Sequence, residues 1–293
     1  MLVSFLENGV EKAGYLSNTG VTALTAINEG LPITMLELVN SGRLDEAARM
    51  AKAYEGPAAP VDSVRLLPPL PRPGKIVCFG LNYVDHATES GFEKPDYPSL
   101  FLRSSTSLTA PGGTLTRPRA SDKLDYEGEL VAVIGRRGRH ISMEEAADFV
   151  CAYSCFNDGS VRDFQLRTTQ WTVGKNFDGT GGFGPGLVPA SELPRLARGL
   201  KLQTRVNGAL MQSANTDDMI FPVAEAVAIV SQAMTLEPGD ILVLGTPSGV
   251  GQSRNPPVFL EHGDVVEVEI EQVGLLRNTV VDEEVQDSLR EVA

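Results

Sequence analysis

The sequence is short of basic residues and has no long apolar run. Its 293 residues include 25 Lys and Arg against 38 Asp and Glu, a formal net charge of −13. Nucleic acids and anionic membranes require a basic surface, so neither is expected as a partner. No segment approaches the roughly 20 apolar residues of a membrane span, and the first residues lack a signal-peptide pattern. We expect a globular cytoplasmic protein in which an anionic substrate would need local positive charge.

Cysteine is scarce as well. Cys78, Cys151 and Cys155 lie in apolar segments, and an odd number does not suit a disulfide framework. We expect reduced thiols that serve as small core residues. A zinc site beginning at Cys151 and Cys155 is not expected, because no Cys or His pair follows at a usable spacing.

The chain divides into three parts. Residues 1–56 carry two hairpin turn signals and then one or two helices between Leu36 and Tyr54, which predicts a small N-terminal α+β domain. Residues 57–74 are rich in proline and predict an extended linker. Residues 75–293 are then the expected catalytic domain.

Strand signals dominate after the linker. A capping box from Ser142 to Glu145 predicts a helix from residue 143, and a second helix is expected over 223–233. The many strands and Gly or Pro turns predict an α+β, mainly β fold with a closed or strongly rolled sheet. The expected strands are 75–79, 124–134, 241–244, and a hairpin of 265–271 with 275–281.

Two carboxylates stand two residues apart in the apolar run that begins at residue 124. Side chains alternate along a strand, so Glu127 and Glu129 should point the same way with only Gly128 between them. Such like charges repel, and a hard divalent cation removes the conflict. The alternative is a solvated strand face, as in the acidic alternation over 266–271.

A third carboxylate follows another apolar run. Asp158 would complete one face of an octahedral Mg²⁺ site with Glu127 and Glu129, although alone it suits a turn. In a helical turn after it, Arg162 and Gln165 lie three apart and can reach the same site. Arg162 suits a bidentate clamp on a substrate carboxylate, or else an ion pair with a surface acid.

A histidine and a carboxylate face each other in the segment after residue 80. On a helical turn, His86 and Glu89 lie at i and i+3, which suits either a general base or a surface contact. Lys175, among apolar and aromatic residues, could neutralise an enolate or reach the surface. Thr246 lies in a glycine-rich turn that lacks the ending of a phosphate-binding loop.

Together these segments resemble the fumarylacetoacetate hydrolase family, in family order from about residue 70 onward. Residues 1–55 are similar to the small N-terminal domain that many members carry. The matching features are Gly80-Leu81-Asn82-Tyr83 with His86 and Glu89, Asp125-Tyr126-Glu127-Gly128-Glu129, Asp158 with Arg162, Asp163 and Gln165, Gly174-Lys175, and the turn from Gly245 to Gly251.

The resemblance implies a mixed β-roll catalytic domain, a homodimer, and Mg²⁺ or Mn²⁺, with Ca²⁺ as a structural substitute. The metal would be held by Glu127, Glu129 and Asp158, and a base formed by His86 and Glu89 would activate water. It further implies that the remaining candidates orient a small anionic keto-acid substrate. These are Lys175, Arg162, Gln165 and Thr246, and Gln170 with Trp171 lies where substrate specificity would be read.

Fold alone does not decide the reaction, because the family is functionally mixed. The sequence favours metal-dependent hydrolysis of a C–C bond in a 2,4-diketo acid of the acylpyruvate or diketo-deoxy sugar acid type, since His86 and Glu89 are both present to make hydroxide. The second hypothesis is an oxaloacetate-type decarboxylase or keto-enol isomerase at the same metal. The third is a non-catalytic metal- or ligand-binding module.

Overall fold

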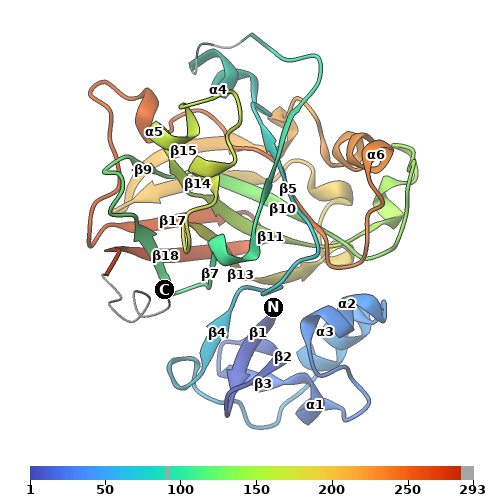
Figure 1. Ribbon diagram of the computed structural model, residues 1–293. Coiled ribbons are helices and arrows are strands. Elements are labelled where there is room, and N and C mark those ends of the chain that lie inside the picture. The colour runs from blue at the N-terminus through green and yellow to red at the C-terminus, as the bar shows by residue number, and fades with distance from the viewer. Residues whose placement is uncertain (90, 92, 285–293) are drawn as a thin grey trace, which may run out of the picture.

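The computed structural model describes residues 1–89, 91 and 93–284. A small N-terminal body, blue in Figure 1, lies below a larger body of strands. Its two hairpins turn where the sequence predicted. Two of its helices occupy the predicted range, and a further short helix over Leu24–Ile27 was not predicted. The elements of the small body are β1 (Leu2–Glu7), β2 (Val10–Ser17), β3 (Gly20–Ala23), α1 (Leu24–Ile27), α2 (Met35–Asn40) and α3 (Leu44–Lys52).

The proline-rich segment contributes structure of its own. After the 3-10 turn η1 (Val61–Ser63), strand β4 (Arg65–Leu67) pairs antiparallel with β1. Strand β1 also pairs with β13 (Gly181–Pro189) through Leu2 and Leu187. Part of the predicted linker therefore extends the N-terminal strands, which are continuous with the sheet of the larger body.

The larger body is built from two mixed sheets, which confirms the predicted mainly β fold. The first runs β3-β2-β1-β13-β11-β10-β16-β5-β6, with β4 and β7 at its side, and the second runs β15-β14-β17-β18-β8. The remaining strands of the first sheet are β5 (Ile76–Gly80), β6 (Ser99–Arg103), β7 (Leu108–Thr109), β10 (Gly128–Ile134), β11 (Val150–Asp158) and β16 (Ile241–Val243). Those of the second are β8 (Thr114–Arg117), β14 (Lys201–Val206), β15 (Ala209–Asn215), β17 (Val265–Ile270) and β18 (Gly274–Asp282), and a separate pair consists of β9 (Leu124–Asp125) and β12 (Ser160–Val161).

Strand β10 is apolar from Leu130 to Ile134 because both of its faces are covered there. Leu130, Ala132 and Ile134 pack into a core shared with the second sheet and with helix α6 (Val223–Ala233). Val131 and Val133 point the other way, into a core shared with α2 and α3 of the N-terminal body. Burial on both faces explains a continuous apolar run where a half-exposed strand would alternate.

Two local predictions differ from the structure. The capping contacts of Ser142 and Glu145 form, but only the 3-10 turn η3 (Ala146–Asp148) follows, so the helix predicted from residue 143 is wrong. Strand β11 begins at Val150 and leaves no room for further helical turns. The strand predicted over 124–134 is interrupted at Tyr126 and Glu127, between β9 and β10.

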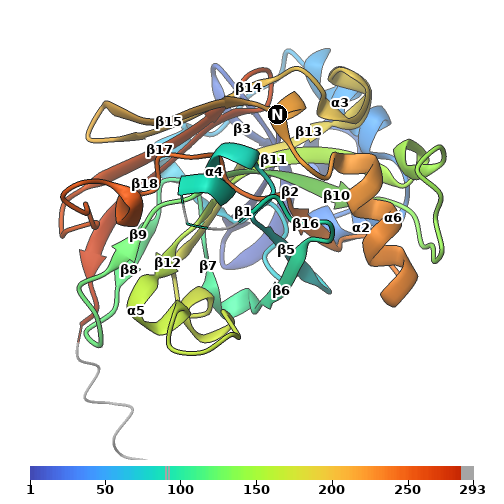
Figure 2. The ribbon, with the colours of Figure 1, turned by 90° about the horizontal axis from the view of Figure 1, so that it is seen from above.

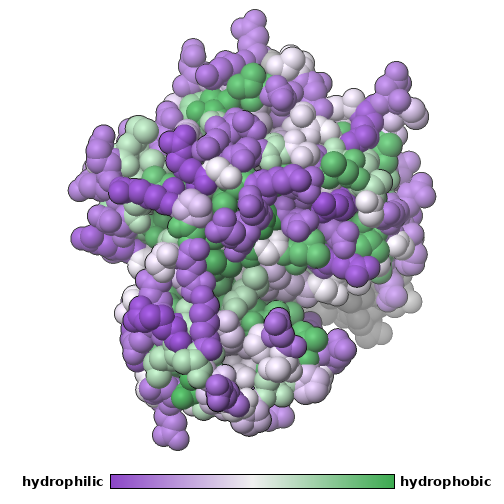
Figure 3. Space-filling view, turned by 180° about the vertical axis from the view of Figure 1, so that it is seen from behind, coloured by the Kyte–Doolittle hydropathy of each residue, from purple (hydrophilic) through white to green (hydrophobic). Residues whose placement is uncertain are grey.

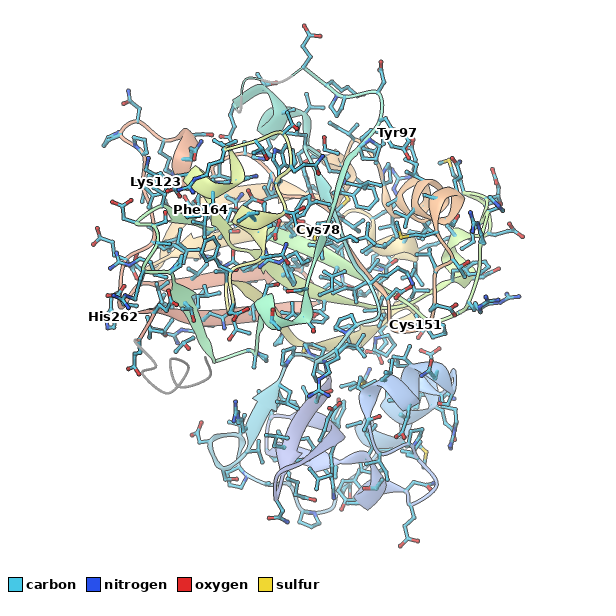
Figure 4. The ribbon with its side chains drawn as sticks, in the orientation of Figure 1. Cys78, Tyr97, Lys123, Cys151, Phe164 and His262 are labelled. Atoms are coloured by element: carbon cyan, nitrogen blue, oxygen red, sulfur yellow. The ribbon has the colours of Figure 1, made fainter. Side chains whose placement is uncertain are left out.

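All three cysteines are free thiols, as expected. Figure 4 places Cys78 in the middle of the larger body and Cys151 near its lower edge, beside the N-terminal body. Seen from behind, the surface is mostly hydrophilic, with apolar side chains visible where the two bodies meet (Figure 3). No helix in the described part of the chain has the length and apolar character needed to cross a membrane.

Candidate metal centre and active site

Three buried carboxylates converge where four strands of the first sheet end. Glu127 precedes β10, Glu129 is its second residue, and Asp158 is the last residue of the neighbouring antiparallel strand β11. Each offers an oxygen, and these three atoms lie within 4.8 Å of one another. The parallel strands β16 and β5 end at the same edge. The predicted convergence of Glu127, Glu129 and Asp158 is thus present.

The backbone around these carboxylates is held by buried hydrogen bonds. The Asn157 side-chain oxygen accepts from the amide of Glu127 at 2.9 Å, and the amide of Asp158 donates to the Glu127 carbonyl at 2.8 Å. Between the two glutamates, the amide of Gly128 donates to the Gln212 side chain at 2.9 Å. A residue of the second sheet, in β15, therefore helps to hold the segment that carries both glutamates.

Cations hold two of the three carboxylates. Lys175 Nζ lies 2.7 Å from both Glu127 Oε2 and Asp158 Oδ2, Arg162 Nη1 lies 2.6 Å from Glu127 Oε1, and Arg103 contacts Asp158. Burial opposes ionisation of Glu127, but Lys175 and Arg162 outweigh it and lower its pKa to about 2. Glu127 is accordingly an anion.

Glu129 lacks such a partner. Among the described residues no salt bridge reaches it, and its carboxylate accepts a hydrogen bond from the amide of Gly245. Burial, then the charges of Asp158 and Glu127, raise its pKa well above the usual range. A buried carboxylate beside two others, without a cation of its own, fits a hard divalent ion, which prefers oxygen ligands.

His86 and Glu89 face each other on α4 (Val84–Glu89), as the spacing predicted. His86 Nδ1 and Glu89 Oε1 are 3.0 Å apart, and the Gly249 amide donates to Glu89 at 2.9 Å. Seen from above, α4 lies over the strands of the larger body (Figure 2). A carboxylate at Nδ1 favours the tautomer whose Nε2 carries the lone pair, so Nε2 can accept a proton.

One cavity of about 340 Å³ joins this pair to the carboxylates. Every predicted site residue except Gln170 lines it. Gln170 is exposed, and its neighbour Trp171 lines the cavity instead. Thr246 is buried, donates to the Gly128 carbonyl at 3.0 Å and accepts from Gln212 at 2.8 Å.

Arg162 makes different contacts from those expected of a substrate clamp. Its Nε donates to Asp125 Oδ2 at 2.8 Å, and its Nη1 contacts both Glu127 and, at 2.9 Å, the Gln165 side-chain oxygen. The neighbouring Asp163 accepts instead from Ser121. The fork of Arg162 therefore holds protein carboxylates, and its role toward substrate stays a prediction.

Sequence reasoning missed three residues that support the site. Arg103, at the end of β6, contacts Asp158 and donates to Thr180 Oγ1 at 3.0 Å. Asp125 accepts from the amides of Gly251 and Gln252, which connects the site to the turn after β16. Gln212 reaches in from the second sheet. Asp125 carried a local signal in the motif with Glu127, whereas Arg103 and Gln212 are remote in sequence from every motif.

The fold is a mainly β roll, and its three buried carboxylates are placed so that they could hold a metal ion. The family model described as fumarylacetoacetate (FAA) hydrolase C-terminal matches residues 75–281, and the chain belongs to this family. The matched residues include every predicted site residue.

Relatives of known name extend this result. The chain is 40% identical over 264 residues to the mitochondrial oxaloacetate tautomerase Fahd2a of Rattus norvegicus, covering 89% of this chain and 84% of the relative. It is 44% identical over 224 residues to the oxaloacetate tautomerase YisK of Bacillus subtilis, covering 75% and 74%. A fumarylacetoacetate hydrolase from Exiguobacterium antarcticum has a similar structure, with a TM-score of 0.81, 34% identity, and 96% and 99% coverage.

Proposed function

We propose that this enzyme is a divalent-metal-dependent tautomerase that interconverts the keto and enol forms of a short 2-oxo acid of the oxaloacetate type. The activity for which the tautomerase relatives are named supports this second hypothesis over the hydrolysis that the sequence favoured. The observation that carries the proposal is the His86–Glu89 pair facing three carboxylates across one small cavity. A tautomerase needs one group that moves a proton and one centre that stabilises an enolate.

Glu127, Glu129 and Asp158 would hold the ion, with Mg²⁺ or Mn²⁺ as the metal. When bound, it would polarise the 2-carbonyl of the substrate and stabilise the negative charge of the enolate. The site contains four buried carboxylates and three buried cationic side chains. The carboxylates are Asp125, Glu127, Glu129 and Asp158, and the cations are Arg103, Arg162 and Lys175. A divalent ion would turn this excess of one negative charge into local positive charge, which an anionic substrate requires.

His86 would move the proton. Its Nε2 accepts the proton from C3, the electron pair of that bond forms the C2–C3 double bond, and the carbonyl electrons move to O2. Nε2 then delivers the proton to O2, which completes the enol. Glu89 holds Nδ1 and stabilises the imidazolium while the proton resides on the ring. Lys175, at the edge of the carboxylates, would offer a point charge to the enolate oxygen.

Hydrolysis of a 2,4-diketo acid is the second candidate. The same His86–Glu89 contact favours it, because a base that accepts a proton from carbon can accept one from water. In that case Gln165 and Thr246 would orient the substrate, and product would appear as two shorter acids.

The decisive experiment compares both reactions on one preparation. Ketonisation of freshly dissolved enol-oxaloacetate is followed by its ultraviolet absorbance with Mg²⁺ or Mn²⁺, and a panel of acylpyruvates is analysed for cleavage products. Because free metal also acts on oxaloacetate, the control is the Glu129→Gln protein with the same metal. Ketonisation no faster than in this control would refute the tautomerase proposal, and cleavage of an acylpyruvate would favour the second candidate.

A further inference from the structure

The only tryptophan of the chain lies in the wall of this cavity. Trp171, in the segment between α5 (Arg162–Gln165) and the 3-10 turn η4 (Val173–Lys175), is partly buried and lines the cavity. Its ring meets Phe101 edge to face, with ring centroids 6.0 Å apart. The Phe101 ring centroid in turn lies 5.2 Å from Lys175 Nζ, the cation that contacts Glu127 and Asp158. The aromatic pair therefore stands one side chain away from the carboxylates.

Gly80 allows the indole to take this position. A Cβ at residue 80 would lie 2.2 Å from Cζ3 and 2.9 Å from Cη2 of Trp171, far inside van der Waals contact. Residue 80 is not among the glycines with positive φ, so the backbone does not itself require glycine here. The requirement is steric, because the six-membered ring of Trp171 rests directly on the end of β5.

Trp171 is one of several apolar residues that line the cavity, together with Leu81, Phe101 and Leu166. Two cationic side chains, Arg162 and Lys175, are among the described lining residues. Both form salt bridges with protein carboxylates. The apolar part of this wall limits how much chain fits beyond the reacting 2-oxo acid group.

We propose that Trp171 is the specificity-determining residue that restricts this cavity to short 2-oxo acids. The proposal rests on the proposed function, since it names the substrate class of the same site. A ligand of oxaloacetate length ends at the indole, and longer chains collide with it. One methylene in a confined apolar pocket changes specificity by about 10- to 200-fold, so a rigid ring suffices to select by length.

The test measures binding separately from turnover. Isothermal titration calorimetry on the Mg²⁺-loaded protein compares oxalate, which offers two adjacent carboxylates and no tail, with 2-oxoadipate, whose 2-oxo acid group carries a long tail. Wild type is compared with Trp171→Ala, Trp171→Phe and the matched control Val173→Ala. Val173 is an apolar residue of the same segment, but it is 59% exposed and does not line the cavity.

Trp171→Ala is expected to raise the affinity for 2-oxoadipate about tenfold or more relative to that for oxalate, Trp171→Phe by less, and Val173→Ala not at all. An unchanged ratio in Trp171→Ala would overturn the proposal. If that variant fails to fold, Trp171→Phe decides: a partial shift supports the proposal and no shift overturns it. A shifted ratio in an enzyme without tautomerase activity would refute the proposed function and leave the length limit standing.

Fluorescence gives an independent reading, because all tryptophan emission comes from Trp171. Saturating oxaloacetate with Mg²⁺ is expected to change the emission of wild type, because a ligand of this length ends at the indole, and the same additions should leave Glu129→Gln unchanged. Emission that stays constant while calorimetry shows oxaloacetate bound would place the indole away from the ligand and overturn the proposal.

Discussion

Glu129 is the residue whose environment most clearly calls for a metal. It is buried next to Glu127 and Asp158, yet Lys175 and Arg162 contact its neighbours and not Glu129 itself. Like charges at such short range destabilise the protein until a cation joins them. Binding of the ion should therefore appear in the stability of the protein as well as in its activity.

We expect Glu129→Gln to remove this dependence on metal. In wild type, Mg²⁺ or Mn²⁺ should raise Tm in proportion to its binding, because it binds only the folded state. In the variant, Tm without metal should equal or exceed that of wild type, and added metal should raise it little. Differential scanning calorimetry checks this, with the exposed Glu144→Gln as control. Equal metal-induced shifts in wild type and Glu129→Gln would contradict the assignment.

A substitution at His86 should separate the effect on proton transfer from the effect on ligand binding. His86→Ala should lower kcat for ketonisation by about 10²- to 10⁴-fold, the usual contribution of a general base, because Nε2 is lost. Affinity for oxalate in the presence of Mg²⁺ should stay within about threefold of wild type, since the carboxylates remain. Steady-state kinetics and calorimetry on the same preparation give both values. Undiminished ketonisation would assign the proton transfer to another group.

At the scale of elements, the site depends on one contact between the two sheets. Gln212 of β15 accepts from the Gly128 amide and donates to Thr246 Oγ1 and to the Pro247 carbonyl, both at 2.8 Å. It thereby joins β10 to the turn after β16. Without this side chain, the buried amide between Glu127 and Glu129 loses its partner.

Gln212→Ala is expected to cost about 1–3 kcal/mol of unfolding free energy, the penalty of an unsatisfied buried polar group. It should also weaken Mg²⁺ binding, because the segment carrying both glutamates loses its support. Urea denaturation and metal titration measure the two effects. The control is Gln232→Ala on α6, where the side chain is exposed. A loss of stability with unchanged metal affinity would limit Gln212 to a structural role.

At the scale of the whole molecule, the N-terminal body shares a core with the catalytic sheet. Leu38 of α2 and Leu44 of α3 belong to the same buried cluster as Val131 and Val133 of β10 and Ile241 of β16. Strand β10 begins at the segment that carries Glu127 and Glu129. Its packing against the N-terminal helices therefore also stabilises the position of these two carboxylates.

We therefore expect the two bodies to unfold together. Leu38→Ala should lower the unfolding free energy by about 2–5 kcal/mol, through lost burial and the cavity left behind. Calorimetry should still show one transition. Val10→Ala, at a 55% exposed position in β2, is the control and should change stability little. Two separate transitions in wild type would show that the bodies are independent.

The sequence by itself determined the features that depend on near neighbours. The spacing of Glu127 and Glu129, the turn between His86 and Glu89, both N-terminal hairpins and the family were all readable, because each depends on a few adjacent residues or on motifs in order. The helix predicted from residue 143 failed for the converse reason, since the start of β11 overrode a good local cap.

Only the tertiary structure decided which charges meet. Arg103 contacts Asp158, which is 55 residues away in sequence, and Gln212 contacts Gly128, which is 84 residues away. The ring of Trp171 packs directly on Gly80. In the folded protein Arg162 contacts Asp125 and Glu127, and Gln170 does not line the cavity. Such contacts depend on how the two sheets pack, and this packing cannot be predicted from the spacing of residues along the chain.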